Sequence, residues 1–260
     1  MATHSSPPRA GKPRPETHAR PSHPPLRNPP PPGARVAIRR LILASASPRR
    51  QEALKALGLE HQIVISHAED HLPPQPDPTD PLPAAHAKAA DVLNQHPDAL
   101  VLAGDTIVVV GGAALGKPGT PENAVSMLRT LRGRLHAVHT AITVVTEEGT
   151  RESRVVAPLA MRDYSDDEVN QYVATGEPLD CAGAYDIHRQ GGQLIASVEG
   201  CFSAIVGLPI AQTVSLLEQT GVSVPRDAAQ VCSALYERPC LASSALTRPR
   251  CLPERRGVGA

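Results

Sequence analysis

The first residues that could do chemistry in this sequence of 260 residues lie in the run Ser45-Ala46-Ser47-Pro48-Arg49-Arg50. A buried-strand pattern, Leu41–Ala44, ends just before it, and Ser47 followed by Pro48 is typical of the start of a helix. The first turn of a helix presents free N–H groups and a partial positive charge, and paired guanidinium groups bind phosphate oxygens in a bidentate way. The run therefore predicts a polyphosphate cradle; a surface arginine pair on an ordinary helix is the alternative.

Carboxylates supply a second set of candidates. Gly104-Asp105-Thr106 directly follows the strand-like stretch 99–103. A carboxylate at the end of a buried strand is costly without a partner, and a metal ion or a water molecule to deprotonate would justify it. Glu69 and Asp70, with Lys88 on the next expected helix, would suit Mg²⁺ and a phosphate oxygen. A strand-ending turn at Asp105 and solvated charge at the acidic pair are the ordinary alternatives.

Later segments add weaker signals. Gly116-Lys117-Pro118 combines close backbone approach with a point charge, and Glu177–Tyr185 mixes carboxylates, glycine and tyrosine in an irregular segment of the kind that often lines sites. His136 and His139 are three residues apart on an expected strand, which puts them on opposite faces and argues against a shared metal ion. No GxxxxGK[ST] or GxGxxG motif is present, so the P-loop and dinucleotide-binding classes are excluded, and the absence of a GxSxG motif argues against Ser-His-Asp catalysis.

The elements that must position these residues alternate between strands and helices. Hairpins are expected at Gly111-Gly112 and at Glu147-Glu148-Gly149, and Ser165 to Glu168 is a capping box. Hairpins within an alternating pattern predict a mixed α/β fold with a mixed sheet. Strands are expected at 41–44, 61–66, 99–103, 107–110, 113–115, 137–146, 151–161, 193–198 and 204–206, and helices after 47 and at 84–95, 121–131, 165–175 and 209–219.

The formal net charge of zero hides an acidic middle between two basic ends. Residues 1–40 carry +7 and 11 of the 28 prolines, residues 41–222 carry −10, and residues 223–260 carry +3. We therefore expect a disordered Pro/Arg-rich extension at 1–38, a folded domain at 39–222 and a loosely ordered extension at 223–260. A nucleic-acid-binding tail is the alternative use of the basic ends, and we do not favour it.

Composition excludes further classes. No apolar run approaches the roughly 18 residues of a membrane span, and no apolar leader with a cleavage site opens the chain, so we expect no membrane contact and a cytoplasmic location. Five cysteines without a CxxC pair support neither a disulfide framework nor a structural zinc site. A few placed cations in an acidic domain favour a divalent metal that carries part of the phosphate charge.

Eight segments in this order resemble the Maf-type nucleotide pyrophosphatases. The resemblance covers about residues 40–221 and neither end, so residues 39–222 would form a Maf-like nucleotide pyrophosphatase domain. The segments are Leu43–Arg50, Glu69-Asp70, Ala87-Lys88-Ala89, Gly104-Asp105-Thr106, Gly116-Lys117-Pro118, Leu131–Thr140, Asp180–Tyr185 and Val206–Pro209.

The resemblance implies an inosine-triphosphatase-like α/β fold, in which helices flank a long, bent mixed sheet and two lobes surround a cleft. It implies hydrolysis of a nucleoside triphosphate to the monophosphate and pyrophosphate, with Mg²⁺, or else Mn²⁺ or Co²⁺, in a cytoplasmic homodimer that cleans the nucleotide pool. The implied roles are general base for Asp105, metal binding for Glu69, Asp70 and Asp105, and substrate binding for Ser45, Ser47, Arg49, Arg50, Lys88, Thr106, Lys117, Tyr185 and His188.

Substrate preference follows from a few positions. Arg49, Thr106 and Ala184-Tyr185 resemble the dTTP/UTP branch of the family, whereas the 7-methyl-GTP branch prefers a Trp in the first motif and Asp-Gln in the second. Two departures stand out: His188 replaces the Gln of the dTTP/UTP branch, and Ala204 stands where many members have Asn. A pyrophosphatase for 7-methyl-GTP or another modified nucleotide, and a non-catalytic nucleotide-binding regulator of septation, are the alternatives.

Overall fold

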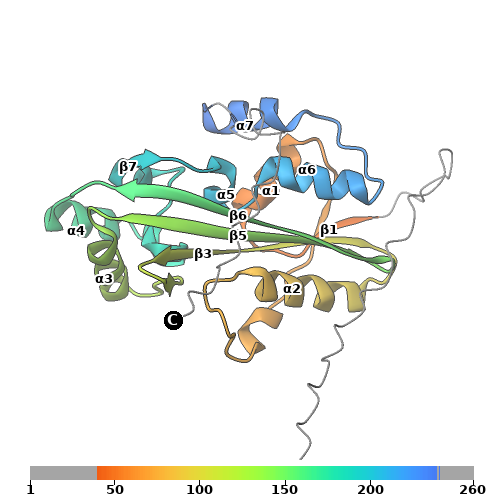
Figure 1. Cartoon of the computed structure of the whole chain (residues 1–260), viewed down its shortest axis with the longest axis horizontal. Helices are drawn as coiled ribbons and strands as arrows, with labels where there is room; N and C mark the ends of the chain where they lie inside the picture. The colour runs from red at the N-terminus through yellow and green to blue at the C-terminus, as the bar shows by residue number, and fades with distance from the viewer. Residues whose placement is uncertain (1–39, 239, 241–260) are drawn as a thin grey trace, which may run out of the picture. The chain divides into compact units, whose positions relative to one another are not determined.

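The computed structural model describes residues 40–238 and residue 240, and their framework is a mixed sheet (Figure 1). Strand β1 pairs in parallel with β2 and β3, and the other pairings are antiparallel. The strand order is β2-β1-β3-β5-β6-β7, with β4 paired to β3. The predicted mixed α/β class is confirmed. The strands are β1 (Leu41–Leu43), β2 (Gln62–Ile63), β3 (Leu100–Val110), β4 (Ala113–Leu115), β5 (Leu135–Thr146), β6 (Gly149–Met161) and β7 (Ile195–Val198).

Helices cover both faces of this sheet. In Figure 1, α2 lies on one side of the long strands, and α1, α6 and α7 lie on the other. The α-helices are α1 (Pro48–Ala56), α2 (Leu82–Gln95), α3 (Pro121–Leu131), α4 (Asp166–Ala174), α5 (Phe202–Val206), α6 (Ile210–Gln219) and α7 (Ala228–Tyr236). Short 3₁₀ helices are η1 (Ala68–His71), η2 (Glu177–Asp180), η3 (Ala182–Ala184) and η4 (Gln190–Leu194).

Alternation along β1 explains the layers. Leu41 and Leu43 pack into a core with residues of α1, α6 and α7, whereas Ile42 packs with residues of α2. Successive side chains of a strand point to opposite faces, so the run of apolar residues in β1 is buried on both sides. A third core, around Leu128 and Tyr164, joins α3 and α4 to the far ends of β3, β5 and β6.

The two strands predicted at 99–103 and 107–110 are one continuous strand, β3. It pairs with β5 without interruption from Val101 to Val109. Asp105 therefore lies in the middle of a strand, and the prediction that it follows a strand end is wrong. At Gly104, a Cβ would lie 3.2 Å from the carbonyl oxygen of Ala141, so glycine lets the pairing continue beside Asp105.

Two other predictions are wrong. Residues 204–206, expected as a strand, belong to α5, because Gly207 adopts a left-handed conformation (φ 114°) and ends a helical turn there. Within the stretch 223–260, expected to be loosely ordered, α7 is a regular helix whose N-terminus is capped by the Asp227 carboxylate. The prediction of disorder at 1–38, and its counterpart for 241–260, fall outside the described residues.

Local signals at turns and caps are confirmed. Gly111 and Gly112 both have positive φ and join β3 to β4, and β5 turns into β6 after Thr146. The capping box at Ser165 and Glu168 is present with both of its hydrogen bonds. Among the described residues, no helix combines the length and apolar character that a membrane span requires.

Candidate active site

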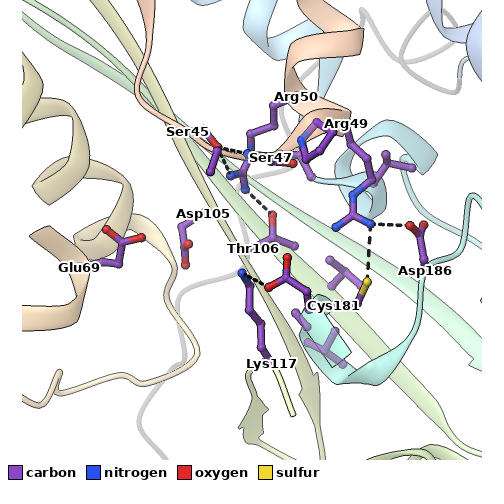
Figure 2. A pocket seen from close by; sticks show the side chains of 18 of the residues that line it. Ser45, Ser47, Arg49, Arg50, Glu69, Asp105, Thr106, Lys117, Cys181 and Asp186 are labelled. Atoms are coloured by element: carbon purple, nitrogen blue, oxygen red, sulfur yellow. Dashed lines mark hydrogen bonds and ion pairs between the residues drawn. The ribbon is translucent and has the colours of Figure 1, made fainter. Parts of the chain in front are cut away.

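A cavity of about 430 Å³ brings almost every candidate residue together (Figure 2). This volume is within the range of roughly 300–1,000 Å³ that is common for small-molecule sites. Its walls come from the β1–α1 junction, η1, α2, β3, the loop after β4, and residues 180–187 and 205–207. His188 is the one candidate outside the wall; those within it are Ser45, Ser47, Arg49, Arg50, Glu69, Asp70, Lys88, Asp105, Thr106, Lys117 and Tyr185.

Arg50 is the buried centre of the first wall. Its Nε donates to the carbonyl oxygen of Gly207 (2.8 Å), Nη1 donates to Ser45 Oγ (2.9 Å), and Nη2 donates to Thr106 Oγ1 (3.1 Å). Burial lowers the pKa of Arg50, although the carboxylate of Asp105 opposes that shift. One guanidinium thus joins the end of β1, the start of α1, strand β3 and the turn after α5.

Lys88 of α2 holds the carboxylates of the same wall. Its side chain is buried, and its Nζ lies 2.9 Å from Asp105 Oδ1 and 3.4 Å from Glu69 Oε1. Asp105 is on β3 and Glu69 is on η1, and in Figure 2 the two carboxylates are neighbours on one side of the cavity. Lys88 contacts Asp105 through Oδ1.

The carboxylates also fit a divalent cation. Mg²⁺ is usually bound by one or two carboxylates together with water and substrate phosphates. Glu69 and Asp105 supply two, and Glu69 Oε2 is buried without a hydrogen-bond partner in the described part of the chain. Asp70 lies at the rim, with a side chain 65% exposed and 3.6 Å from His67. No group of three or more His, Cys, Asp or Glu residues in 40–238 and 240 is arranged to hold a metal by itself, so phosphate oxygens would have to complete the shell.

The opposite wall pairs its cations with acids from the segment 177–191. Lys117 Nζ lies 2.7 Å from Asp180 Oδ1, and both side chains are exposed at the cavity mouth. Arg49 Nη1 lies 2.6 Å from Asp186 Oδ2 and 3.7 Å from Cys181 Sγ. Asp186 was missed in the sequence: it follows the Tyr185 motif, but no spacing signal links it to an arginine 137 positions earlier.

Tyr185 lies in this second wall. Its ring is buried, and its hydroxyl is 2.9 Å from His136 Nε2, with the two rings edge to face at 5.6 Å. Burial raises the pKa of Tyr185 and lowers the pKa of His136 to about 4. Both groups are therefore neutral near pH 7, and the Tyr185 ring can form an uncharged surface of the cavity.

The structure does not bring His188 to the cavity, contrary to the prediction that it contacts the base. Its side chain is exposed, and its ring packs edge to face on Tyr236 of α7 at 5.4 Å. The backbone N–H of His188 donates to Asp186 Oδ1 (3.0 Å), which turns the chain away from the cavity at this point. Helix α7, which carries Tyr236, was not predicted, so this contact could not be foreseen.

Gly183 fixes how closely the second wall approaches β3. It has φ 69°, and a Cβ there would lie 2.8 Å from Val108 Cγ2. Its N–H donates to the carbonyl oxygen of Gly116 (3.0 Å), so the segment is also tied to the loop that carries Lys117. Only glycine combines this left-handed backbone with so close a contact.

The fold and the cavity define an α/β protein with a small-molecule site in which placed cations and carboxylates face one another. The model of the Maf-like protein family matches residues 40–220, and the chain belongs to this family.

Curated relatives match over nearly their whole length. The dTTP/UTP pyrophosphatase of Bacillus velezensis is 38% identical over 185 residues, which cover 71% of this chain and 98% of the relative. The protein of the same name from Moorella thermoacetica is 44% identical, over 71% of this chain and 97% of the relative. The one from Anaeromyxobacter dehalogenans is also 44% identical, over 72% of this chain and 96% of the relative. Among solved structures, a HAM1 protein from Coxiella burnetii is 16% identical with a TM-score of 0.43, over 70% of this chain and all of that one. So distant a likeness has no bearing on function.

Proposed function

We propose that this chain hydrolyses nucleoside triphosphates, with UTP and dTTP preferred, to the monophosphate and pyrophosphate. The observation that carries the proposal is the Lys88–Asp105–Glu69 cluster in the same cavity as the Arg50 network and the start of α1. A base, cations and helix N–H groups in one cavity are the parts that phosphoryl chemistry requires. The names of the curated relatives support the same activity.

In this mechanism Asp105 accepts the proton of the water that attacks the α-phosphorus. Lys88 orients the carboxylate through Oδ1, and Oδ2 takes the proton. Glu69 and Asp105, with Asp70 at the rim, would hold a divalent cation, Mg²⁺ before Mn²⁺ or Co²⁺. Such a cation, when bound, neutralises phosphate charge and acidifies the attacking water.

The cationic side chains and the first turn of α1 would bind the phosphates. Arg49 and Lys117 face the cavity from the second wall, and Ser45 and Ser47 line the β1–α1 junction. Positive groups held in place stabilise the charge that spreads over the phosphate oxygens as the bond breaks. Because Lys117 already contacts Asp180, a substrate phosphate competes with this acid, whereas Arg49 contacts Asp186 through Nη1 alone.

Base selection is assigned to the second wall. The uncharged ring of Tyr185 lines the cavity there, in the same wall as Arg49. Two further expectations stay predictions: that the chain forms a homodimer, and that it works in the cytoplasm.

The test is a triphosphate panel with Mg²⁺, which includes UTP, dTTP, CTP, ATP, GTP and 7-methyl-GTP. Pyrophosphate should be released, fastest from UTP and dTTP, and chelation of the metal should stop the reaction. Release of orthophosphate alone would contradict the mechanism. Nucleotide binding without turnover would favour the alternative of a non-catalytic regulator of septation. A preference for 7-methyl-GTP would favour the 7-methyl-GTP branch of the family.

Asp105→Asn keeps the shape of the side chain and removes the base. We expect kcat to fall at least about 10²-fold, the lower end of the contribution of a general base. Asp166→Asn is the matched control, because Asp166 pairs with Arg129 and Arg132 on the surface, outside the cavity. Near-normal turnover of Asp105→Asn would refute the role of Asp105 as the general base.

A further inference from the structure

Asp186 is a buried carboxylate in the cavity wall for which the proposed reaction has no use. Its side chain is only 7% exposed. Oδ2 lies 2.6 Å from Arg49 Nη1, Oδ1 accepts the N–H of His188, and Arg189 approaches only to 3.9 Å. A buried carboxylate without a charged partner is strongly unfavourable, so folding itself enforces the pair with Arg49.

The ion pair with Asp186 sets the orientation of the Arg49 guanidinium. Arg49 and Arg50 are adjacent at the start of α1, yet Figure 2 shows the Arg50 guanidinium directed to Ser45 and Thr106, and that of Arg49 directed to Asp186 and Cys181. Burial opposes the charged form of Arg49, but Asp186 and Cys181 outweigh it and raise the pKa of the guanidinium. Arg49 therefore stays charged on the side of the cavity away from Asp105.

The acid, and not the arginine, is the anchored member of the pair. The backbone N–H of Asp186 donates to Tyr172 Oη (3.0 Å). Tyr172 in turn donates to Glu177 Oε1 (2.9 Å), which also accepts the N–H of Gly191 (3.1 Å). Asp186 is thus fixed to α4 and to both ends of the segment 177–191. The side chain of Arg49 is 31% exposed.

We propose that Asp186 is a positioning residue for substrate binding, because it holds the Arg49 guanidinium in the second wall of the cavity, where Arg49 meets the nucleoside triphosphate. The inference rests on the proposed function and adds to it a residue on the wall opposite the base Asp105. Loss of Asp186 frees Arg49 to rotate and leaves the Lys88–Asp105 pair unchanged. Binding should weaken, and the chemical step should continue.

The variant that tests this is Asp186→Asn, which keeps the size of the side chain and an acceptor for the His188 N–H. We expect KM for UTP to rise about tenfold and kcat to stay within about twofold, the signature of a lost binding contact. A merely structural role would lower kcat and the melting temperature together. Asp166→Asn removes a carboxylate from two arginines outside the cavity and should change neither constant.

A double-mutant cycle shows whether Asp186 acts through Arg49. In an Arg49→Ala background, Asp186→Asn should change KM by less than about twofold, because the group that it positions is gone. Effects on KM that simply multiply would overturn the proposal. If Arg49→Ala fails to fold, a crystal structure of Asp186→Asn tests the proposal instead. In that structure the Arg49 side chain should no longer contact Cys181. An unchanged Arg49 position would overturn the proposal.

Failure of this inference can be separated from failure of the proposed function. If the wild type releases pyrophosphate and Asp186→Asn has the wild-type KM, the inference alone is wrong. If the wild type releases none, the proposed function fails, and calorimetric titration of UTP into both proteins still tests Asp186. An about tenfold weaker Kd in the variant would support the inference, and equal Kd values would overturn it.

Discussion

The two walls of the cavity are built by different means. The first wall rests on regular elements, with Arg50 on α1, Lys88 on α2 and Asp105 on β3, and of its residues Glu69 lies on a short 3₁₀ helix. The second wall, which carries Tyr185 and Asp186, is a chain of 3₁₀ turns held by side-chain hydrogen bonds and by a left-handed glycine. Backbone pairing fixes the residues that would react, and side-chain bonds fix those that would select the substrate.

This difference has a consequence for tolerance to change. A residue in β3 is held by continuous pairing with β5, so a changed side chain leaves the backbone in place. In the second wall, one substitution can shift the segment that carries several contacts. The following experiments compare the two walls, starting from the largest expected effect.

Arg50→Lys should give the largest effect, in the first wall. Lysine cannot supply the three separate donors that reach Gly207, Ser45 and Thr106. We expect the free energy of unfolding to fall by about 3 kcal/mol, because buried acceptors lose their partner. Urea denaturation measures it, with Arg129→Lys as the exposed control. A loss no larger than that of the control would show that the three Arg50 hydrogen bonds add nothing to the backbone pairing of the first wall.

The second prediction concerns pH and His136, which supports Tyr185. Burial lowers the pKa of His136 to about 4, against 6.5 for the ordinary group, so the unfolded chain binds the proton more readily. Stability from this group is complete above pH 6.5 and is lost as the pH falls toward 4, by at most about 3 kcal/mol. Urea midpoints of the wild type should fall more steeply over this range than those of His136→Gln. Parallel curves would contradict the buried neutral imidazole.

The third prediction separates backbone strain from contact in the second wall. Gly183 and Gly176 have φ of 69° and 74°, but a Cβ at Gly176 meets no atom within 4 Å, whereas one at Gly183 meets Val108. Gly176→Ala should cost about 1 kcal/mol and Gly183→Ala about 2 kcal/mol or more. Thermal unfolding gives the difference. Equal losses of stability in the two variants would mean that the close approach of Gly183 to Val108 of β3 adds no cost.

The smallest effect is expected from His188→Gln. Its ring contacts Tyr236 outside the cavity, so the ratio of kcat/KM for UTP to that for dTTP should stay within about twofold. A clear change in the substrate profile would show that His188 contacts the substrate and that the second wall lies differently from its position in the structure.

The sequence predicted the first wall better than the second. Glycines, caps and apolar runs located β1, α1, α3 and the β5–β6 hairpin, because these signals act between near neighbours in the chain. Helices α5 and α7 were missed. The end of α5 depends on one left-handed glycine, and α7 follows a stretch without clear periodicity.

The members of the site were predicted, but their partners were not. Arg49, Lys88 and Lys117 were expected to bind phosphate, yet each contacts a carboxylate that lies from 17 to 137 positions away in the chain. Such pairs depend on tertiary packing, for which a single sequence has no local signal. Asp186 was overlooked and His188 misplaced for the same reason.

These internal ion pairs make nucleotide entry an exchange of anions. Within the described part of the chain, Lys88 and Lys117 already have carboxylate partners before any phosphate arrives. A phosphate oxygen that binds either lysine must compete with an existing contact, which lowers the net gain from binding. The same acids reclaim their cations when the products leave. A site of this kind restrains its own affinity for pyrophosphate, and so favours turnover over retention.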